Sequence, residues 1–439
     1  MRFGAGSGRR SPTVSSRQPP PPHIERAALV TIYPTSAARR AAEDSLIELD
    51  GLAAAAGARS VLRVLQERKS PDPATFLGSG KVASLAAACA EVRVDVVVVD
   101  HELTPAQLRE LESRLHCRVV DRTQLILDIF ARRARTREGR WQVELAQLEY
   151  LLPRLVGRGV TLSRLGGGIG TRGPGETKLE TDRRRIRDRI AAIRKDLEQL
   201  RRRRAQLRER RQKRAVPTVA LVGYTNAGKT TLFNRLARES AVASDALFVT
   251  LDPLVRHVTL PGGAGILLTD TVGFIERLPH ALVAAFRATL EEVAEADLVV
   301  HVVDAATDGR SRMMAAVMAV LEEVGAAEVP RLTVYNKLDR LSASDRTRLR
   351  REDPEAVQIS ATSGVGIDAL LGAVSTQLGL DVVRVTVTLD PSDAKDRAVA
   401  AEVYRTSVVR NHVETAERIT IEADVPRRLA QRLMRRQET

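Results

Sequence analysis

The feature that most constrains the fold is a glycine-rich loop between an apolar run and a helical segment. Residues 219–222 form an apolar, strand-like stretch that leads directly into the loop, and residues 231–237 have helical composition. The loop has the pattern G-x-x-x-x-G-K-T and comprises Gly223, Tyr224, Thr225, Asn226, Ala227, Gly228, Lys229 and Thr230. Between a strand and a helix, the N–H groups of such a loop wrap phosphates, and the helix N-terminus adds the positive end of its dipole. We therefore expect a P-loop α/β domain in which Lys229 reaches the β- and γ-phosphates and Thr230 binds Mg²⁺.

Three further motifs follow downstream, each at the end of a predicted strand. They comprise Asp270, Thr271, Val272 and Gly273; Asn336, Lys337, Leu338 and Asp339; and Ser360, Ala361 and Thr362. Asp270 fits the acidic residue that holds Mg²⁺, commonly through water, and the N–H of Gly273 is expected to sense a γ-phosphate. Four motifs in this order predict a single nucleotide site.

The last two motifs predict which base the site selects. A carboxylate at Asp339 can accept hydrogen bonds from N1–H and N2–H₂ of guanine, and the Ala361 N–H can meet guanine O6. Adenine offers no such pair of donors, so a buried Asp339 would be left as an unpaired charge against ATP. An ATPase would leave the motif at 336–339 without a role. We therefore predict a GTP hydrolase.

A threonine between the first two motifs is a candidate switch residue. It lies in the stretch Phe248, Val249, Thr250, Leu251 and Asp252. A threonine here can complete the Mg²⁺ shell only when the γ-phosphate is present, which would order this segment with GTP and release it after hydrolysis. The alternative is a plain loop threonine.

Two residues of the predicted site suggest how hydrolysis is controlled. Phe274 follows Gly273, where a Ras-like enzyme has a glutamine that orients water, and a phenyl ring cannot hydrogen-bond water. We therefore expect slow intrinsic turnover that a partner raises. The side-chain oxygen of Asn226 is a candidate ligand for K⁺ beside the phosphates, which predicts different rates in KCl and NaCl.

Charge is concentrated in one segment of the chain. The formal net charge is +14, yet residues 131–215 alone hold 26 Lys and Arg against 10 Asp and Glu. A basic field this local suits a polyphosphate backbone, because each neutralised phosphate releases a counterion. The alternative is a solvated charged helix. A membrane-surface helix fits less well, because the apolar face is narrow and lacks Trp and Phe anchors.

The same segment has the periodicity of two packed helices. Apolar residues recur at spacings of four and three in two stripes, Trp141, Leu145, Leu148, Leu152 and Leu155, and Ile186, Ile190, Ile193, Leu197 and Leu200. Such stripes pack one helix along another, so residues 131–215 are predicted to form a basic helical hairpin. The glycine-rich loop at 166–175 would form its tip, either as a passive connector or as a mobile probe into RNA.

The rest of the chain divides by composition. Residues 1–23 are rich in Gly, Ser, Arg and Pro and read as a disordered tail, with an organelle transit peptide as the alternative. Residues 24–130 and 216–380 alternate strand and helix patterns, which predicts an N-terminal α/β domain and a G domain. Residues 381–439 are expected to form a small α+β C-terminal unit with strands at 382–389 and 418–423 and two helical stretches.

Composition excludes several classes of protein. No apolar run approaches about 18 residues, so no membrane span is expected. Two cysteines, Cys89 and Cys117, cannot form a disulfide framework in a chain of 439 residues, which favours a reducing, cytoplasmic location. We expect the chain to act as a monomer.

Several stretches together resemble the HflX-type GTPases, a ribosome-associated family, over about residues 25–380. They are DRTQLILDIF at 121–130, QVELAQL at 142–148, GGIG at 167–170, RGPGET at 172–177, LETDRR at 179–184, TLDP at 250–253 and DTVGF at 270–274, with a weaker LGSGK turn at 77–81. The match at 250–253 supports Thr250 as the Mg²⁺ threonine. The DTVGF form implies that the missing glutamine is usual for the family.

The resemblance implies a partner and a task. It implies binding to the large ribosomal subunit and its rRNA, stimulation of GTP hydrolysis by that subunit, and splitting of stalled or stressed ribosomes. The loop at 166–175 would then reach toward the peptidyl-transferase region. Two alternatives stay open, which are a GTPase that remodels RNA through residues 1–130 and the hairpin, and a GTP switch that docks a protein partner through the G domain.

Overall fold

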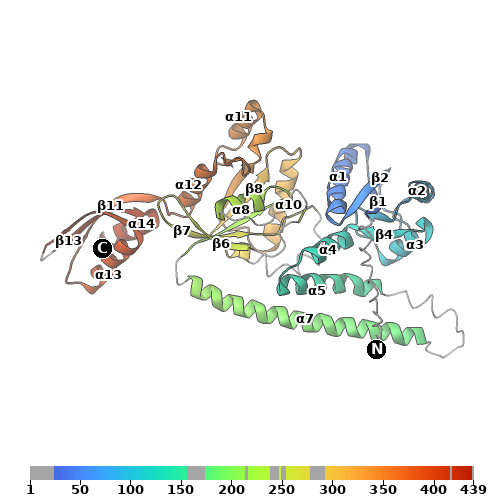
Figure 1. The fold of residues 1–439 in the computed structure, drawn as a ribbon, viewed down its shortest axis with the longest axis horizontal. Coiled ribbons are helices and arrows are strands. Elements are labelled where there is room, and N and C mark those ends of the chain that lie inside the picture. Colours follow the sequence, from blue (N-terminus) through green and yellow to red (C-terminus); the bar gives the residue numbers. More distant parts are fainter. Residues whose placement is uncertain are drawn as a thin grey trace, which may run out of the picture.

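The computed structural model describes residues 24–155, 174–212, 216–237, 247–248, 254–276, 292–415 and 418–437 (Figure 1). Within these ranges the chain builds three sheets and a pair of long helices. The nucleotide-loop sheet lies between the N-terminal sheet and the small C-terminal sheet, and the longer helix runs along one side of the molecule (Figure 1). No described helix is long and apolar enough to span a bilayer.

The N-terminal sheet is entirely parallel and has the strand order β2-β1-β3-β4. Its elements are β1 (Glu25–Tyr33), η1 (Ser36–Ala38), α1 (Arg39–Ala55), β2 (Ala58–Glu67), α2 (Ser79–Glu91), β3 (Val96–Val99), α3 (Pro105–Leu115), β4 (Arg118–Asp121) and α4 (Arg122–Arg133). Both faces are covered, because Leu29 packs into a core with α1 and α4 while Val30 packs into a core with α2 and α3. The buried valine run of β3 follows from this double covering.

Local signals set the ends of these helices. Thr104 caps α3, accepting a hydrogen bond from the Gln107 N–H, while the Gln107 side chain accepts from the Thr104 N–H. Asp121 ends β4 and caps α4 by accepting from the Gln124 N–H. The chain therefore passes from strand to helix with no connecting loop at this point.

The predicted pair of long helices is present as α5 (Arg137–Arg154) and α7 (Pro174–Gln212). Their two stripes meet along a shared apolar cluster, at whose centre Leu145, Ile190 and Ile193 are buried. Leu155 and Leu200 lie outside this cluster. Ion pairs flank it, with Arg189 bonded to both oxygens of Glu144 and Arg194 to Glu149. Of the predicted glycine loop, residues 166–173 lie outside the described residues, and Pro174 and Gly175 already belong to α7.

The nucleotide-loop sheet has the order β10-β9-β8-β5-β7-β6, parallel except for β6. Its elements are β5 (Thr218–Gly223), α8 (Lys229–Ala237), β6 (Leu254–Thr259), β7 (Gly265–Asp270), β8 (Leu298–Asp304), α10 (Arg310–Glu323), β9 (Arg331–Asn336), η2 (Leu338–Arg340), α11 (Ala343–Glu352), β10 (Val357–Gln358) and α12 (Ile367–Gln377). The β5–α8 connection is the P-loop, so the expected strand–loop–helix unit and α/β fold are confirmed.

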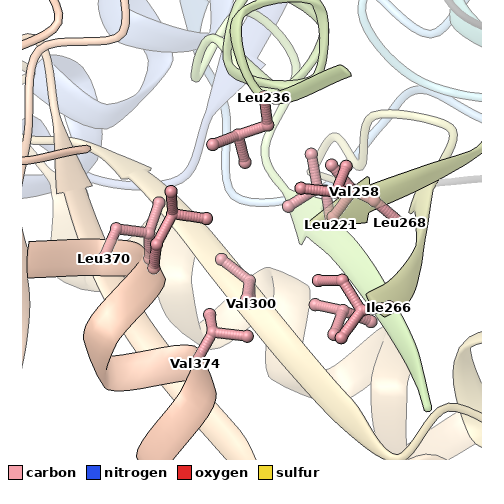
Figure 2. A pocket seen from close by; sticks show the side chains of 10 residues that line it. Leu221, Leu236, Val258, Ile266, Leu268, Val300, Leu370 and Val374 are labelled. Carbon is pink, nitrogen blue, oxygen red and sulfur yellow. The ribbon is translucent and has the colours of Figure 1, made fainter. Parts of the chain in front are cut away.

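Apolar side chains fill the layer between this sheet and helices α8 and α12 (Figure 2). Leu236 from α8 and Leu370 from α12 face Val300 and Leu221 of the central strands (Figure 2). The nucleotide loop is therefore anchored at both ends, because β5 before it and α8 after it pack into the same apolar core.

The C-terminal unit is an antiparallel sheet with the order β11-β13-β12, covered on one side by two helices. It comprises β11 (Val382–Leu389), α13 (Ala394–Thr406), β12 (Val408–Glu414), β13 (Ile419–Pro426) and α14 (Arg427–Gln437). The sequence prediction of two strands omitted β12. This edge strand is largely exposed, and its sequence VVRNHVE lacks the alternation that marks a half-buried strand.

Candidate nucleotide site

The P-loop backbone takes conformations that glycine makes accessible. Gly228 has φ 93°, and a Cβ there would lie 2.2 Å from Nδ2 of Asn336. Gly223 has φ 151°, and a Cβ there would meet the Val302 carbonyl oxygen at 2.2 Å. Gly223 is thus required by the close main chain of β8 and Gly228 by the Asn336 side chain, in both cases as well as by the backbone angle. Asn226 is exposed at the loop tip in the left-handed region, with φ 61°.

Lys229, at the first turn of α8, is buried beneath the loop. Its Nζ donates to the carbonyl oxygens of Gly223 at 2.9 Å and Tyr224 at 2.8 Å. Burial lowers the pKa of Lys229 to about 8, with Asp270 opposing and Lys337 assisting that shift. The ammonium group is therefore held by main-chain oxygens but lacks full charge compensation, which suits it to a phosphate.

Thr230 and Asp270 are brought together from the two motifs. The Thr230 hydroxyl donates to Oδ2 of the fully buried Asp270 at 2.9 Å. Asp270 ends β7, and its neighbour Thr271 donates to the Leu221 carbonyl at 2.6 Å, which ties β7 to β5. A hydroxyl and a carboxylate side by side are hard oxygen donors of the kind that Mg²⁺ prefers.

Gly273 lies against the P-loop. A Cβ on this residue would sit 2.9 Å from Thr225 Cγ2 and 3.1 Å from Lys229 Nζ. The following residue, Phe274, is buried, and its N–H donates to the Gly223 carbonyl at 3.1 Å while its carbonyl accepts from the Thr225 N–H at 2.7 Å. The main chain next to Gly273 is therefore hydrogen-bonded to the P-loop, and the Phe274 ring packs in the core.

The predicted base-reading residues are connected by hydrogen bonds. Asn336 donates from Nδ2 to the Ala227 carbonyl at 2.9 Å and accepts the Ala361 N–H on Oδ1 at 2.9 Å. The Ser360 hydroxyl donates to Asp339 at 2.5 Å. Asn336 thus joins the P-loop to the motif at 360–362.

Asp339 differs from the expectation in one respect. The sequence argument assumed a buried carboxylate, whereas Asp339 is exposed. It lies in the short helix η2, where Leu338 turns inward and its neighbours turn outward. The hydrogen bond from Ser360 lowers the pKa of Asp339, so the carboxylate is ionised and oriented although solvent reaches it.

Arg235 is a site residue that sequence reasoning missed. From α8 its Nε donates to the Ala361 carbonyl at 2.5 Å, and its Nη2 bonds the Thr362 carbonyl. The guanidinium therefore holds the main chain of the 360–362 motif at two consecutive carbonyl oxygens. No local pattern marks this arginine, because its partners lie far away in sequence.

Part of the predicted first switch lies outside the described residues, namely Val249, Thr250, Leu251 and Asp252. Phe248 is described and buried, and its ring packs edge-on against Phe130 of α4 at 4.6 Å between centroids. The start of this segment therefore contacts the N-terminal sheet's helices.

Comparison with protein families places three models along the chain. The models described as GTP-binding GTPase N-terminal, GTP-binding GTPase Middle Region and 50S ribosome-binding GTPase match residues 43–131, 133–211 and 218–337. In order they follow the N-terminal sheet apart from β1, the long helices, and most of the nucleotide-loop sheet.

Curated relatives resemble the chain over most of its length. A GTPase HflX from Caldanaerobacter subterraneus is 50% identical over 354 residues, which are 81% of each chain. The Escherichia coli GTPase HflX is 48% identical over 85% of this chain and 88% of its own, and a Chlamydia pneumoniae GTPase HflX is 37% identical over 97% and 90%.

Among solved structures, a GTP-binding protein from Sulfolobus solfataricus in complex with GDP matches with 22% identity and a TM-score of 0.41. The match covers 81% of this chain and 99% of that one. The identities to curated relatives over four fifths of the chain, together with the three family models matched in order along it, show that this GTP hydrolase belongs to the HflX family of GTPases.

Proposed function

We propose that this GTPase binds the large ribosomal subunit, is stimulated by it, and dissociates stalled or stressed ribosomes. In this proposal the basic segment 131–215 contacts the rRNA, and GTP favours the bound state while hydrolysis allows release. The single observation that carries the proposal is the excess of 26 basic over 10 acidic residues in this segment. The description of the model matched by residues 218–337, a 50S ribosome-binding GTPase, supports the same partner.

The geometry of α7 supports an RNA contact. One side of the helix is occupied by α5, and several described arginines elsewhere on it are exposed, with the side chains of Arg185 and Arg202 each 76% accessible. Several of these arginines lie near acidic residues one turn away, but such exposed pairs are weak and yield readily to phosphate. A long helix with exposed cationic side chains suits binding to the phosphate backbone of a structured RNA.

For hydrolysis we propose these roles. Lys229 neutralises charge between the β- and γ-phosphates, the Gly273 N–H donates to the γ-phosphate, and Asn336, Asp339 and Ala361 orient the guanine. Thr230 and Asp270 would hold Mg²⁺, with Thr250 as the third ligand. When bound, the metal supplies positive charge at the phosphate oxygens. Asn226 is proposed to bind K⁺, and equal turnover in KCl and NaCl would contradict that part.

The proposal also explains why a partner is needed. Phe274 is buried and bonded to the P-loop only through its main chain, so it cannot orient an attacking water. Water activation must come from another group, and a ribosome-bound state is where we propose that it is completed.

The deciding experiment measures GTP hydrolysis by the full chain, alone and with large ribosomal subunits, across a salt series. Stimulation that weakens steeply with salt is expected. The triple variant R201Q/R202Q/R203Q should reduce the salt slope by about one unit for each arginine that contacts a phosphate. The matched control is R348Q/R350Q/R351Q, which removes the same charge from the exposed face of α11.

The outcomes separate the candidate functions. Stimulation lost in the α7 variant and kept in the α11 variant supports the proposal. Absence of stimulation would overturn it. In that case, release of strands from ribosome-free RNA duplexes would indicate an RNA-remodelling GTPase. Ribosome binding that is unchanged in both the α7 variant and the α11 variant would favour docking of a protein partner through the G domain.

A further inference from the structure

The stretch DRTQLILDIF at 121–130 places one arginine at the contact between the N-terminal sheet and the nucleotide loop. Arg122 is the first residue of α4, directly after the strand β4. It is buried although it is charged, with only 3% of its surface accessible. A buried arginine demands partners, and here they come from both sides of the contact.

On its own side, Arg122 is fixed by Asp100 at the end of β3. Nη1 donates to Oδ1 of Asp100 at 2.7 Å, and Asp100 is completely buried. Ser45 of α1 donates to the other carboxylate oxygen at 2.5 Å. The guanidinium is therefore held in one orientation, with Nη2 directed toward the nucleotide-loop sheet.

From Nη2 a closed ring of hydrogen bonds crosses the contact. Nη2 donates to Glu48 of α1 and, at 3.0 Å, to the carbonyl oxygen of Glu276. The other oxygen of Glu48 accepts the hydroxyl of Tyr224. That hydroxyl in turn accepts the N–H of Glu276 at 2.8 Å. Arg122, Glu48, Tyr224 and Glu276 thus close the ring.

Two members of this ring belong to the machinery for GTP. Tyr224 is the second residue of the P-loop, and its carbonyl holds Nζ of Lys229. Glu276 lies three residues after Gly273, on the segment whose main chain bonds the P-loop at Phe274. Nε of Arg312 on α10 lies 2.5 Å from Oε1 of Glu276. The segment that the ring holds is therefore also held by an ion pair to α10.

The protonation states suit this arrangement. Burial raises the pKa of Tyr224, and Glu48 adds to the rise, so the hydroxyl stays protonated and donates. Burial lowers the pKa of Arg122, but Glu48 and Asp100 together outweigh it and keep the guanidinium charged.

We propose that Arg122 and Glu48 are positioning residues for GTP hydrolysis. By holding Tyr224 and Glu276 together, they keep the Gly273 N–H at the distance that the γ-phosphate requires. GDP has no γ-phosphate and makes no use of Gly273. The inference rests on the proposed role of the Gly273 N–H in hydrolysis, concerns the chain's own turnover, and does not depend on a ribosomal partner.

The test uses the full chain with two isosteric variants, Glu48→Gln and Tyr224→Phe. Each should lower kcat for GTP about tenfold, the usual effect of losing one hydrogen bond to a charged group, while KM for GTP and the GDP affinity change less than twofold. Because both variants break the same ring, the double variant E48Q/Y224F should be no slower than either single variant. Glu48→Asp, which keeps the charge, should recover part of kcat.

A matched control separates positioning from loss of stability. Arg68 makes a partly buried pair with Asp72 at 3.0 Å after β2, and neither residue belongs to a G motif or to the basic segment 131–215. Arg68→Gln should lower the melting temperature and leave kcat unchanged. The proposal is overturned if Glu48→Gln weakens GDP binding more than twofold, if kcat rises or stays the same, if the two single effects multiply in the double variant, or if Arg68→Gln lowers kcat equally.

Discussion

Lys229 links burial to nucleotide binding at the scale of a single residue. Its pKa is lowered to about 8 because burial removes water, while Asp270 partly opposes and Lys337 assists the shift. In the unfolded chain this lysine has an ordinary pKa near 10.5. Between about pH 8 and pH 10.5 the unfolded chain therefore binds a proton that the folded chain does not, so the free energy of unfolding rises with pH in that range. Phosphate charge favours the ammonium form, so bound nucleotide should raise this pKa again.

The first prediction is therefore that binding of GDP takes up a proton above pH 8. Affinity should fall about fivefold between pH 8 and pH 9, since the deprotonated lysine must recover its proton to bind phosphate. Calorimetry in buffers of different ionisation enthalpy measures the uptake. Lys229→Arg stays charged, so it should bind GDP without proton uptake, and it controls for titration of the guanine base. An equal pH dependence of GDP affinity in the two proteins would contradict the prediction.

The second prediction concerns Arg235, which holds the carbonyls of Ala361 and Thr362. Removing it with Arg235→Ala should loosen the 360–362 motif, which we propose to read guanine, so affinity for GDP falls about tenfold while kcat at saturating GTP changes less than twofold. The comparison is Arg348→Ala on the exposed face of α11, which should change neither quantity. A fall in kcat with unchanged GDP affinity would show that the arginine acts on the phosphate end instead.

At the scale of elements, the α5–α7 pair shows how a short apolar seam supports a long charged helix. Ile193 is fully buried at the centre of the seam, and two arginine–glutamate contacts flank it. Exposed ion pairs of this kind contribute little, so the apolar side chains carry most of the stability of the contact.

The third prediction follows from that balance. Ile193→Ala should destabilise the α5–α7 contact by about 2–4 kcal/mol, because it removes buried methyl groups and leaves a cavity. Hydrogen exchange should then accelerate in both helices, with little change in the strands of the nucleotide-loop sheet. Leu151→Ala on the exposed side of α5 is the control, with an expected effect under about 0.5 kcal/mol. Equal exchange in the two variants would mean that the seam does not hold the helices.

For the whole molecule, one apolar core joins the N-terminal sheet's helices to the nucleotide-loop sheet. It includes Phe130 from α4, Phe248 from the predicted first switch, and Phe274 beside the second motif. Since both segments that we propose to sense the nucleotide contribute to this core with α4, the N-terminal sheet and the G motifs are expected to unfold together.

The fourth prediction tests that coupling. Phe130→Ala should remove the edge-on contact with Phe248 and cost about 3–5 kcal/mol, so that one calorimetric transition divides into two. Phe76→Ala lies in the core on the other face of the N-terminal sheet and serves as the control. It should lower the melting temperature without dividing the transition. Two separate transitions already present in the unmodified chain would contradict the shared core.

The sequence by itself determined the local units. The P-loop, the strands that carry the other G motifs and the two helical stripes were predictable, because each depends on residues within a few turns of one another. The position of the 336–339 motif at the end of β9 was predictable for the same reason, while its role in guanine recognition stays a prediction. The edge strand β12 escaped prediction, because strand pairing there does not require a buried face.

Only the tertiary structure decided which distant residues complete the site. Arg235 meets Ala361 across 126 positions, and Arg122 meets Glu276 across 154. Nothing local marks such pairs, because they arise when two sheets and their helices pack on a common core. The motifs therefore determine the local geometry. The ring that joins Arg122 to the P-loop depends instead on how the N-terminal sheet and the nucleotide-loop sheet pack together.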